Sequence, residues 1–113
     1  MSGQDILGKE GQSMTGKQKS FLRGLAHNLQ PIIQIGKNLV TTTVVDTVVK
    51  ALEARELIKV SVLQNCLAEP KEVAAVLAEH AEAEVIQVIG RTIILYKRSN
   101  NKENREISNR IPK

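Results

Sequence analysis

One short segment of the sequence combines groups that can bind an anion. Residues 31–43 read PIIQIGKNLVTTT, where Pro31–Ile35 predicts a buried strand and Gly36-Lys37-Asn38 predicts a turn. Apolar residues then recur at helical spacing and predict a helix over Thr42–Arg55. The first N–H groups of a helix lack partners within the helix, and the helix dipole favours negative charge there. A glycine that admits close backbone approach, next to the charge of Lys37, therefore predicts a phosphate-binding turn.

A second candidate anion site lies on the helix predicted before this strand. Thr15 is expected to cap that helix, with Gln18 as its reciprocal partner. The predicted buried side consists of Phe21, Leu22, Leu25 and Leu29. Basic residues recur every four positions on an exposed side, preceded by one further lysine; these are Lys17, Lys19, Arg23 and His27. A merely solvated helix face usually mixes both signs of charge, so we interpret this acid-free stripe as an anion-binding surface.

The distribution of charge along the chain also favours a polyanionic partner. Residues 11–45 contain no carboxylate, whereas residues 46–84 hold eight acids and four bases. Residues 85–113 hold seven bases against two acids, and Lys97 and Arg98 come directly after the last predicted strand. The net charge of +4 is thus concentrated in the two ends of the 113-residue chain. Such segregation is typical of proteins that bind nucleic acid.

The elements that must position these residues alternate along the chain. Strands are predicted at 57–63, 85–89 and 92–96, and a third helix begins at Pro70. The order α-β-α-β-α-β-β predicts one α/β domain over residues 14–97, with a mixed four-stranded sheet and three helices mainly on one face, in two layers. Residues 1–13 are expected to be an extension without fixed structure, native or vector-derived, and residues 98–113 a basic polar tail.

The last two strands predict a hairpin whose register assigns side chains to faces. Gly90-Arg91 is typical of a type II′ turn, which pairs Ile89 with Thr92. Cross-strand partners share a face, so the residues expected inward are Ile86, Val88, Ile93 and Leu95. Those expected outward are Gln87, Ile94 and Tyr96. On the third helix we expect an inward side of Val73, Val76, Leu77 and Ala81 and an exposed acidic side of Glu69, Glu72, Glu79 and Glu82.

The sequence lacks the residues that several classes of function require. Cys66 is the one cysteine, which excludes an internal disulfide, and neither a zinc-ligand set nor a P-loop or GxGxxG motif is present. Cys66, His27 and His80 show no nucleophile–base arrangement, so no enzyme, cofactor or small-molecule substrate is expected. No apolar run reaches the ~18 residues of a membrane helix, and no secretory signal is visible. We expect a cytoplasmic monomer.

Three segments in this order resemble the CRM domain family, whose bacterial members are of the YhbY type: residues 22–38 (LRGLAHNLQPIIQIGKN), 51–60 (ALEARELIKV) and 85–97 (VIQVIGRTIILYK). The resemblance covers about residues 15–107. It implies an RNA-binding domain similar to the C-terminal domain of a bacterial translation initiation factor, acting on precursors of the large ribosomal subunit. It also implies that a GxxG loop contacts RNA, as in KH domains.

The GxxG loop maps onto Gly36-Lys37-Asn38-Leu39, where Leu39 replaces the second glycine. Leucine adopts a positive φ only at a cost, and its side chain would hold a phosphate away from the backbone, so we expect weaker binding here or greater reliance on Lys37 and the helix stripe. With one Phe, one Tyr and no Trp, base stacking has a single candidate platform, Tyr96, which we interpret as a packing residue. The alternative is a protein-interaction module that uses the acidic third helix or the outer sheet face.

Overall fold

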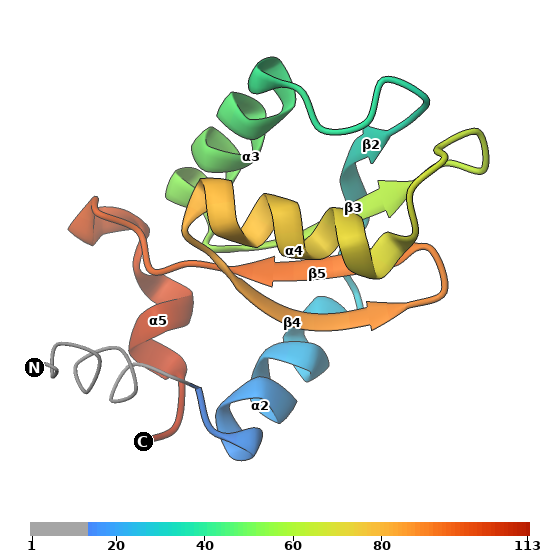
Figure 1. The fold of residues 1–113 in the computed structure, drawn as a ribbon. Coiled ribbons are helices and arrows are strands. Elements are labelled where there is room, and N and C mark those ends of the chain that lie inside the picture. The colour runs from blue at the N-terminus through green and yellow to red at the C-terminus, as the bar shows by residue number, and fades with distance from the viewer. Residues whose placement is uncertain (1–13) are drawn as a thin grey trace, which may run out of the picture.

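The computed structural model describes residues 14–113, so the extension expected at residues 1–13 lies outside the described part of the chain (Figure 1). In chain order the elements are α2 (Gly16–Ala26), β2 (Pro31–Ile35), α3 (Thr42–Arg55), β3 (Leu57–Val62), α4 (Pro70–Ala81), β4 (Glu84–Ile89), β5 (Thr92–Tyr96), the 3-10 helix η1 (Lys102–Asn104) and α5 (Glu106–Arg110). The predicted α/β class and the order of its first seven elements are confirmed.

The four strands form one mixed sheet in the order β2-β3-β5-β4. β2 and β3 are parallel, and β5 is antiparallel to both of its neighbours, β3 and β4. Ile89 pairs with Thr92, and the turn between them has a φ of 56° at Gly90 alone, as a type II′ turn requires. The expected mixed sheet and hairpin are therefore confirmed.

The main core lies between the sheet and the pair α3 and α4, above the sheet in Figure 1. It is aliphatic, as the composition predicts, and α4 contributes Val73, Ala74, Leu77 and Ala81. The expectation that Val76 points inward is wrong, because 38% of this residue is exposed. The buried stripe of α4 runs through position 74 instead, which turns Val76 toward the start of α3.

A second core covers the opposite face of the sheet, so the expectation of helices mainly on one face is wrong. α2 packs there through Leu22 and Ala26, below the sheet in Figure 1. The register shifts between Val85 and Gln87, and this bulge brings Ile86 to the α2 side, in place of the inward side that we expected. The strand residues of this second core are Leu57, Ile86, Ile94 and Tyr96. Ile94 and Tyr96 face outward from the main core, as predicted, but α2 buries them.

The C-terminal segment, expected as a polar tail, folds back over the same face. Ile107 and Ile111 pack against the second core. The buried carboxylate of Glu56 accepts hydrogen bonds from the backbone N–H of Ser99, at 2.8 Å, and of Ser108, at 2.9 Å. These bonds join polar groups that lie 43 and 52 positions apart in the chain, which is why local periodicity does not predict η1 or α5.

Candidate nucleic-acid interface

The GKNL turn connects the end of β2 to the start of α3. The backbone N–H of Leu39 donates to the carbonyl of Gly36 at 3.0 Å, which closes a tight turn that leaves Lys37 and Asn38 exposed. Thr41 caps α3, and its hydroxyl accepts a hydrogen bond from the N–H of Val44 at 3.1 Å. Lys37 therefore lies in an exposed turn a few residues before a helix N-terminus, an arrangement that favours an anion.

Leu39 occupies a backbone conformation that normally favours glycine. Its φ is 59°, and 39% of its surface is exposed. A leucine in the left-handed region costs roughly 1–2 kcal/mol relative to the ordinary conformations. The turn therefore keeps the shape that a second glycine would allow, at an energetic cost, and its apolar side chain occupies the space next to the turn.

A loop and a hairpin support the GKNL turn from the same end of the sheet. The position of a β-carbon on Gly36 would lie 3.4 Å from Asn65 Oδ1 and 3.6 Å from Leu63 Cδ1. Arg91 donates from Nη2 to the carbonyl of Leu63 at 2.8 Å and from Nε to that of Val62 at 2.9 Å. Arg91 thus fixes the hairpin against the loop that supports the turn, a role that the Gly90-Arg91 turn motif alone does not predict.

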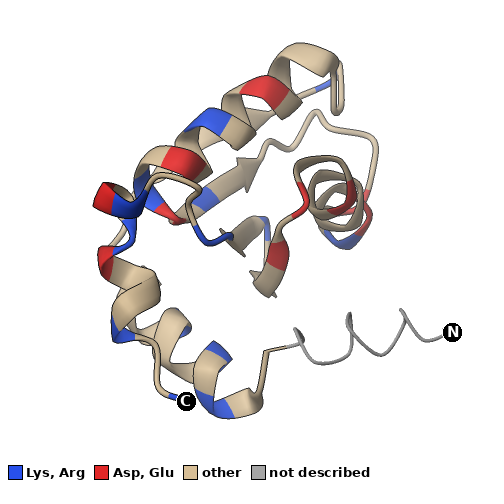
Figure 2. Cartoon of the chain, turned by 90° about the vertical axis from the view of Figure 1, so that its left-hand side faces the viewer, with Lys and Arg blue, Asp and Glu red and all other residues tan. Residues whose placement is uncertain are grey.

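The helix that carries the basic stripe begins at the predicted cap. The backbone N–H of Thr15 donates to Gln18 Oε1 at 2.9 Å, and the N–H of Gln18 donates to the Thr15 hydroxyl at 3.1 Å, so the capping box is confirmed. Lys17 and His27 are exposed, whereas Lys19 and Arg23 are half-buried. Figure 2 shows Lys and Arg without Asp or Glu along α2, whereas α3 and α4 carry both signs.

A pocket of about 230 Å³ lies between the C-terminal end of α2 and the strands β3, β4 and β5; we call it the α2–sheet pocket. Arg23 and His27 line it from α2, together with Lys59 of β3. Lys59 Nζ donates to the backbone carbonyl of His27 at 3.5 Å, where the helix dipole is negative. Our sequence-based site omitted Lys59, because the side of the sheet that α2 covers was not predicted.

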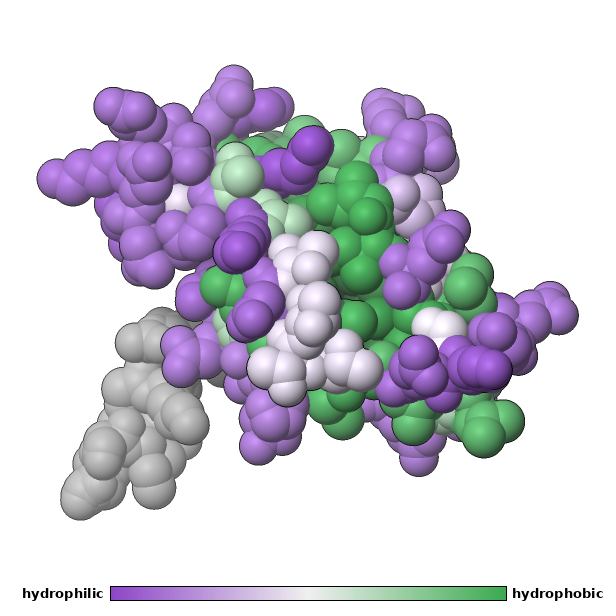
Figure 3. All heavy atoms as spheres, turned by 90° about the horizontal axis from the view of Figure 1, so that it is seen from above, coloured by the Kyte–Doolittle hydropathy of each residue, from purple (hydrophilic) through white to green (hydrophobic). Residues whose placement is uncertain are grey.

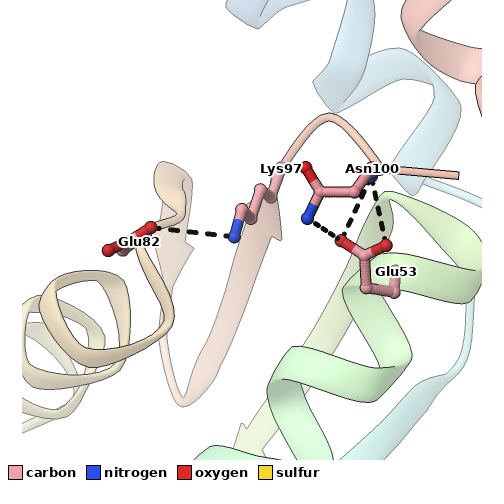
Figure 4. A network of polar contacts seen from close by, with 4 residues as sticks. All are labelled: Glu53, Glu82, Lys97 and Asn100. Atoms are coloured by element: carbon pink, nitrogen blue, oxygen red, sulfur yellow. Dashed lines mark hydrogen bonds and ion pairs between the residues drawn. The ribbon is translucent and has the colours of Figure 1, made fainter.

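Lys97 and Arg98 lie apart from this cluster, near the start of α2, where they line a pocket of about 800 Å³ with Thr15 and Gln18. Lys97 Nζ is 4.0 Å from the carboxylate of Glu82, the one ion pair within residues 14–113 (Figure 4). Arg98 is exposed. The structure thus joins Arg23, His27 and Lys59, whereas the GKNL turn lies on the other side of the sheet, beside α3 (Figure 1).

The cysteine and the tyrosine, which could otherwise take part in chemistry or base stacking, are both buried in the fold. The thiol of Cys66 is buried in the main core and lies 3.7 Å from the carbonyl of Ala68. Tyr96 is 7% exposed, and burial raises the pKa of its phenol above 10.0. Within residues 14–113, no three His, Cys, Asp or Glu side chains gather as metal ligands, and no helix is long and apolar enough to span a bilayer.

Comparison with known proteins identifies a family and several relatives. The family model of the CRS1/YhbY (CRM) domain matches residues 14–97. The chain is 52% identical over 94 residues to a Bacillus subtilis protein named "Probable RNA-binding protein YqeI", covering 83% of this chain and 96% of the relative. It is 34% identical over 87 residues to a Haemophilus influenzae protein named "RNA-binding protein", covering 77% of this chain and 88% of the relative.

A solved structure has the same fold. The solution structure of the hypothetical protein SAV1595 from Staphylococcus aureus superposes with a TM-score of 0.71 at 44% sequence identity. The match covers 88% of this chain and all of that one. Because the family model spans most of the chain and the relatives match over most of their length, the chain belongs to the CRS1/YhbY (CRM) domain family.

Proposed function

We propose that this protein binds structured RNA without catalysing a reaction, by docking its basic surface onto the phosphate backbone. The observation that carries the proposal is the basic helix α2, which contains no acidic residue and carries the exposed Lys17 and the half-buried Lys19 and Arg23. None of these side chains forms an ion pair within the described residues. Cations without protein partners release counterions from phosphates when they bind RNA, and this release supplies most of the affinity.

The GKNL turn is proposed as a second contact on the same RNA. Arg91 is bonded to the loop that supports Gly36 and is next to Thr92, which lines the α2–sheet pocket. The end of the sheet therefore connects the turn to the basic residues of α2. An RNA that follows this end would meet Lys37 at one side and Arg23 at the other. Lys97 is proposed to contribute less, because the carboxylate of Glu82 lies 4.0 Å from its Nζ and competes with a phosphate for it.

The class of RNA is proposed from the family. Relatives are named RNA-binding proteins, and we propose precursors of the large ribosomal subunit in the cytoplasm as the target, as the resemblance of the three sequence segments to the CRM family implies. The composition of the site supports structured RNA, because Tyr96 is buried and Phe21 is half-buried beside Arg110, so the described chain has no fully exposed Phe, Tyr or Trp to stack single-stranded bases.

The test is a salt series of binding to fragments of large-subunit ribosomal RNA. In a Lys19→Ala, Arg23→Ala, Lys37→Ala variant, the slope of log affinity against log salt should become shallower by about 2–3 units, because each phosphate contact contributes roughly −0.7 to −0.9. The matched control removes three exposed bases from α3 and α4, with Lys50→Ala, Arg55→Ala and Lys71→Ala. An equal effect of both variants would contradict the proposed surface.

A second candidate function is docking of a protein on α4. Val76 is 38% exposed beside a pocket of about 230 Å³ that is lined by Val40, Val45 and His80. Figure 3, seen from the α3 and α4 side, shows apolar residues that reach the surface between polar groups. Binding of ribosomal particles that is insensitive to salt and to the α2 substitutions, but lost in Val76→Asp, would favour this alternative.

A further inference from the structure

The floor of the α2–sheet pocket is defined by the register of the sheet. Ile94 of β5 pairs with Lys59 on one side and with Gln87 on the other, so these three side chains share a face. Thr92 lies two residues before Ile94 on the same face and pairs with Ile89. Ile94 is 4% exposed and forms an apolar base, whereas Ile89, at 58% exposed, forms an apolar rim.

Two neutral polar side chains complete the lining between these apolar groups. The amide of Gln87 offers both donors and an acceptor, and the hydroxyl of Thr92 can donate and accept. Both residues are half-buried, so their hydrogen-bonding groups line the pocket and remain accessible. The lining thus combines an apolar floor with groups that can read a polar edge.

The charge of the pocket is positive. Arg23, His27 and Lys59 line it, and no carboxylate does. The C-terminal end of α2 carries roughly half a negative charge, which alone would repel an anion. Lys59 lies against that end, at 3.5 Å from the carbonyl of His27, and together with Arg23 it outweighs the helix dipole with two full charges.

The size of the pocket limits what can enter. At about 230 Å³ it has the volume of roughly eight liquid water molecules and lies below the ~300 Å³ of pockets for drug-sized ligands. A single planar ring system with exocyclic groups fits this limit. Because the pocket borders the basic residues of α2, a phosphate linked to that ring would lie beside Arg23 or Lys59.

We infer that the α2–sheet pocket receives one unpaired nucleotide of the bound RNA, with its base on Ile94, its polar edge on Gln87 and Thr92, and its phosphate on Arg23 or Lys59. This inference rests on the RNA binding proposed above and adds a preference for RNA that contains an extruded base. Unpaired bases are the usual targets of sequence-dependent RNA recognition. An acidic side chain of a protein would satisfy the three bases but is acceptor-only, and so would leave the Gln87 carbonyl without a donor.

The test compares two RNA hairpins of the same stem, one fully paired and one with a single-nucleotide bulge, at one salt concentration. Wild type should prefer the bulged hairpin by about tenfold, and Gln87→Leu, Thr92→Val should abolish the preference while leaving the affinity for the paired hairpin unchanged. The matched control, Gln34→Leu, Ser61→Ala, removes the same chemical groups from the same sheet face outside the pocket lining and should retain the preference.

The outcomes separate this inference from the proposed function. If wild type binds neither hairpin, the proposed RNA binding fails; if it binds both equally, only the pocket assignment fails. A second measurement does not depend on the folding of any variant: the side-chain amide resonances of Gln87 in wild type should shift with nucleoside 5′-monophosphates and not with inorganic phosphate. Equal shifts with inorganic phosphate or with an acidic peptide would overturn the assignment to a nucleotide.

Discussion

The carboxylate of Glu56 holds Ser108 by two hydrogen bonds across a separation of 52 residues. The backbone N–H of Ser108 donates to Oε1 at 2.9 Å, and its hydroxyl donates to Oε2. Since a serine hydroxyl has one hydrogen, the phenol of Tyr96 must donate to the Ser108 oxygen in turn. Tyr96, Ser108 and Glu56 therefore form a directed chain of hydrogen bonds that anchors α5 to the end of β5.

Glu56 reaches this position through its own backbone. It is fully buried and ends α3 with a φ of 67°, a conformation that favours glycine. Its carbonyl also accepts a hydrogen bond from the N–H of Lys97 at 2.9 Å. A glycine would relieve the backbone but could not bind the C-terminal segment, so the side chain explains why a costly conformation is kept here.

Replacement of this carboxylate should destabilise the protein. Glu56→Gln keeps the shape of the side chain but places an amide N–H₂ group, which cannot accept a hydrogen bond, opposite donors of Ser99 or Ser108. We therefore expect a loss of about 2–3 kcal/mol in the free energy of unfolding. Urea denaturation measures the loss, and hydrogen exchange should show reduced protection of the Ser99 and Ser108 amides. Increased protection or unchanged stability would contradict the anchoring role.

Glu53 provides the matched control for this substitution. It accepts hydrogen bonds from the same segment, including those from the backbone and side chain of Asn100 at 3.1 and 3.0 Å (Figure 4). Glu53 is only half-buried, and water can replace those bonds. Glu53→Gln should therefore cost less than about 1 kcal/mol.

The free energy of unfolding should depend on the ionisation of Tyr96 at high pH. Burial, together with the charge of Glu56, raises the pKa of this phenol above 10.0. The folded state then binds the proton more tightly, so the stabilisation is fully present below pH 10 and is lost as pH rises through the folded pKa. Tyr96→Phe should cost about 1 kcal/mol at neutral pH and remove this part of the alkaline loss.

Two measurements check this prediction. Tyr96 is the one tyrosine in a chain without tryptophan, so tyrosinate absorbance reports its pKa directly. Denaturation of wild type and Tyr96→Phe at neutral and alkaline pH then gives the difference between their free energies of unfolding. The effect of lysine titration cancels in this difference, because both proteins contain the same lysines. A tyrosinate pKa below 10 would contradict the burial that the structure places at this residue.

Local sequence patterns were sufficient to predict the elements that carry the proposed site. The boundaries of α3 and the capping box of α2 agree with the structure because each depends on residues within a few positions, such as Thr15 and Gln18. The GKNL turn was located for the same reason, because a glycine and polar residues separate an apolar strand from an apolar helix.

Contacts between distant segments were not predictable from those patterns. Ile86 changes face because of a bulge, which a strict alternation of side chains cannot indicate. The position of α2 over Ile94 then creates the pocket that includes Lys59. The C-terminal helix α5 depends on the buried side chain of Glu56, which lies 52 positions before Ser108 in the chain.

The ion pair between Lys97 and Glu82 should limit the part of Lys97 in RNA binding. Its Nζ lies 4.0 Å from the carboxylate, whereas the neighbouring Arg98 is exposed. We expect Arg98→Ala to reduce RNA affinity more than Lys97→Ala, and Glu82→Gln to increase affinity about twofold by releasing Lys97. Titrations of one structured RNA at low salt measure all three, and a weaker affinity in Glu82→Gln would refute the release.

Leu39→Gly should make the GKNL turn both more stable and a better phosphate site. Removal of the side chain relieves the cost of φ at 59°, and the greater freedom of glycine in the unfolded chain offsets part of the gain, which leaves about 0–1 kcal/mol of stabilisation. RNA affinity should rise about two- to fivefold, because a phosphate can then approach the backbone N–H groups. Denaturation and RNA titration measure the two effects separately.

The control for this substitution is Leu67→Gly. Leu67 is 90% exposed in the neighbouring loop and has an ordinary φ, so glycine there relieves no strain and should leave stability unchanged or slightly lower. If both variants changed RNA affinity equally, the effect would come from loss of apolar surface rather than from the turn. If Leu39→Gly weakened binding, the leucine side chain would itself contact the RNA. That contact would then explain why the costly backbone conformation of Leu39 is kept, and the predicted gain in affinity would be wrong.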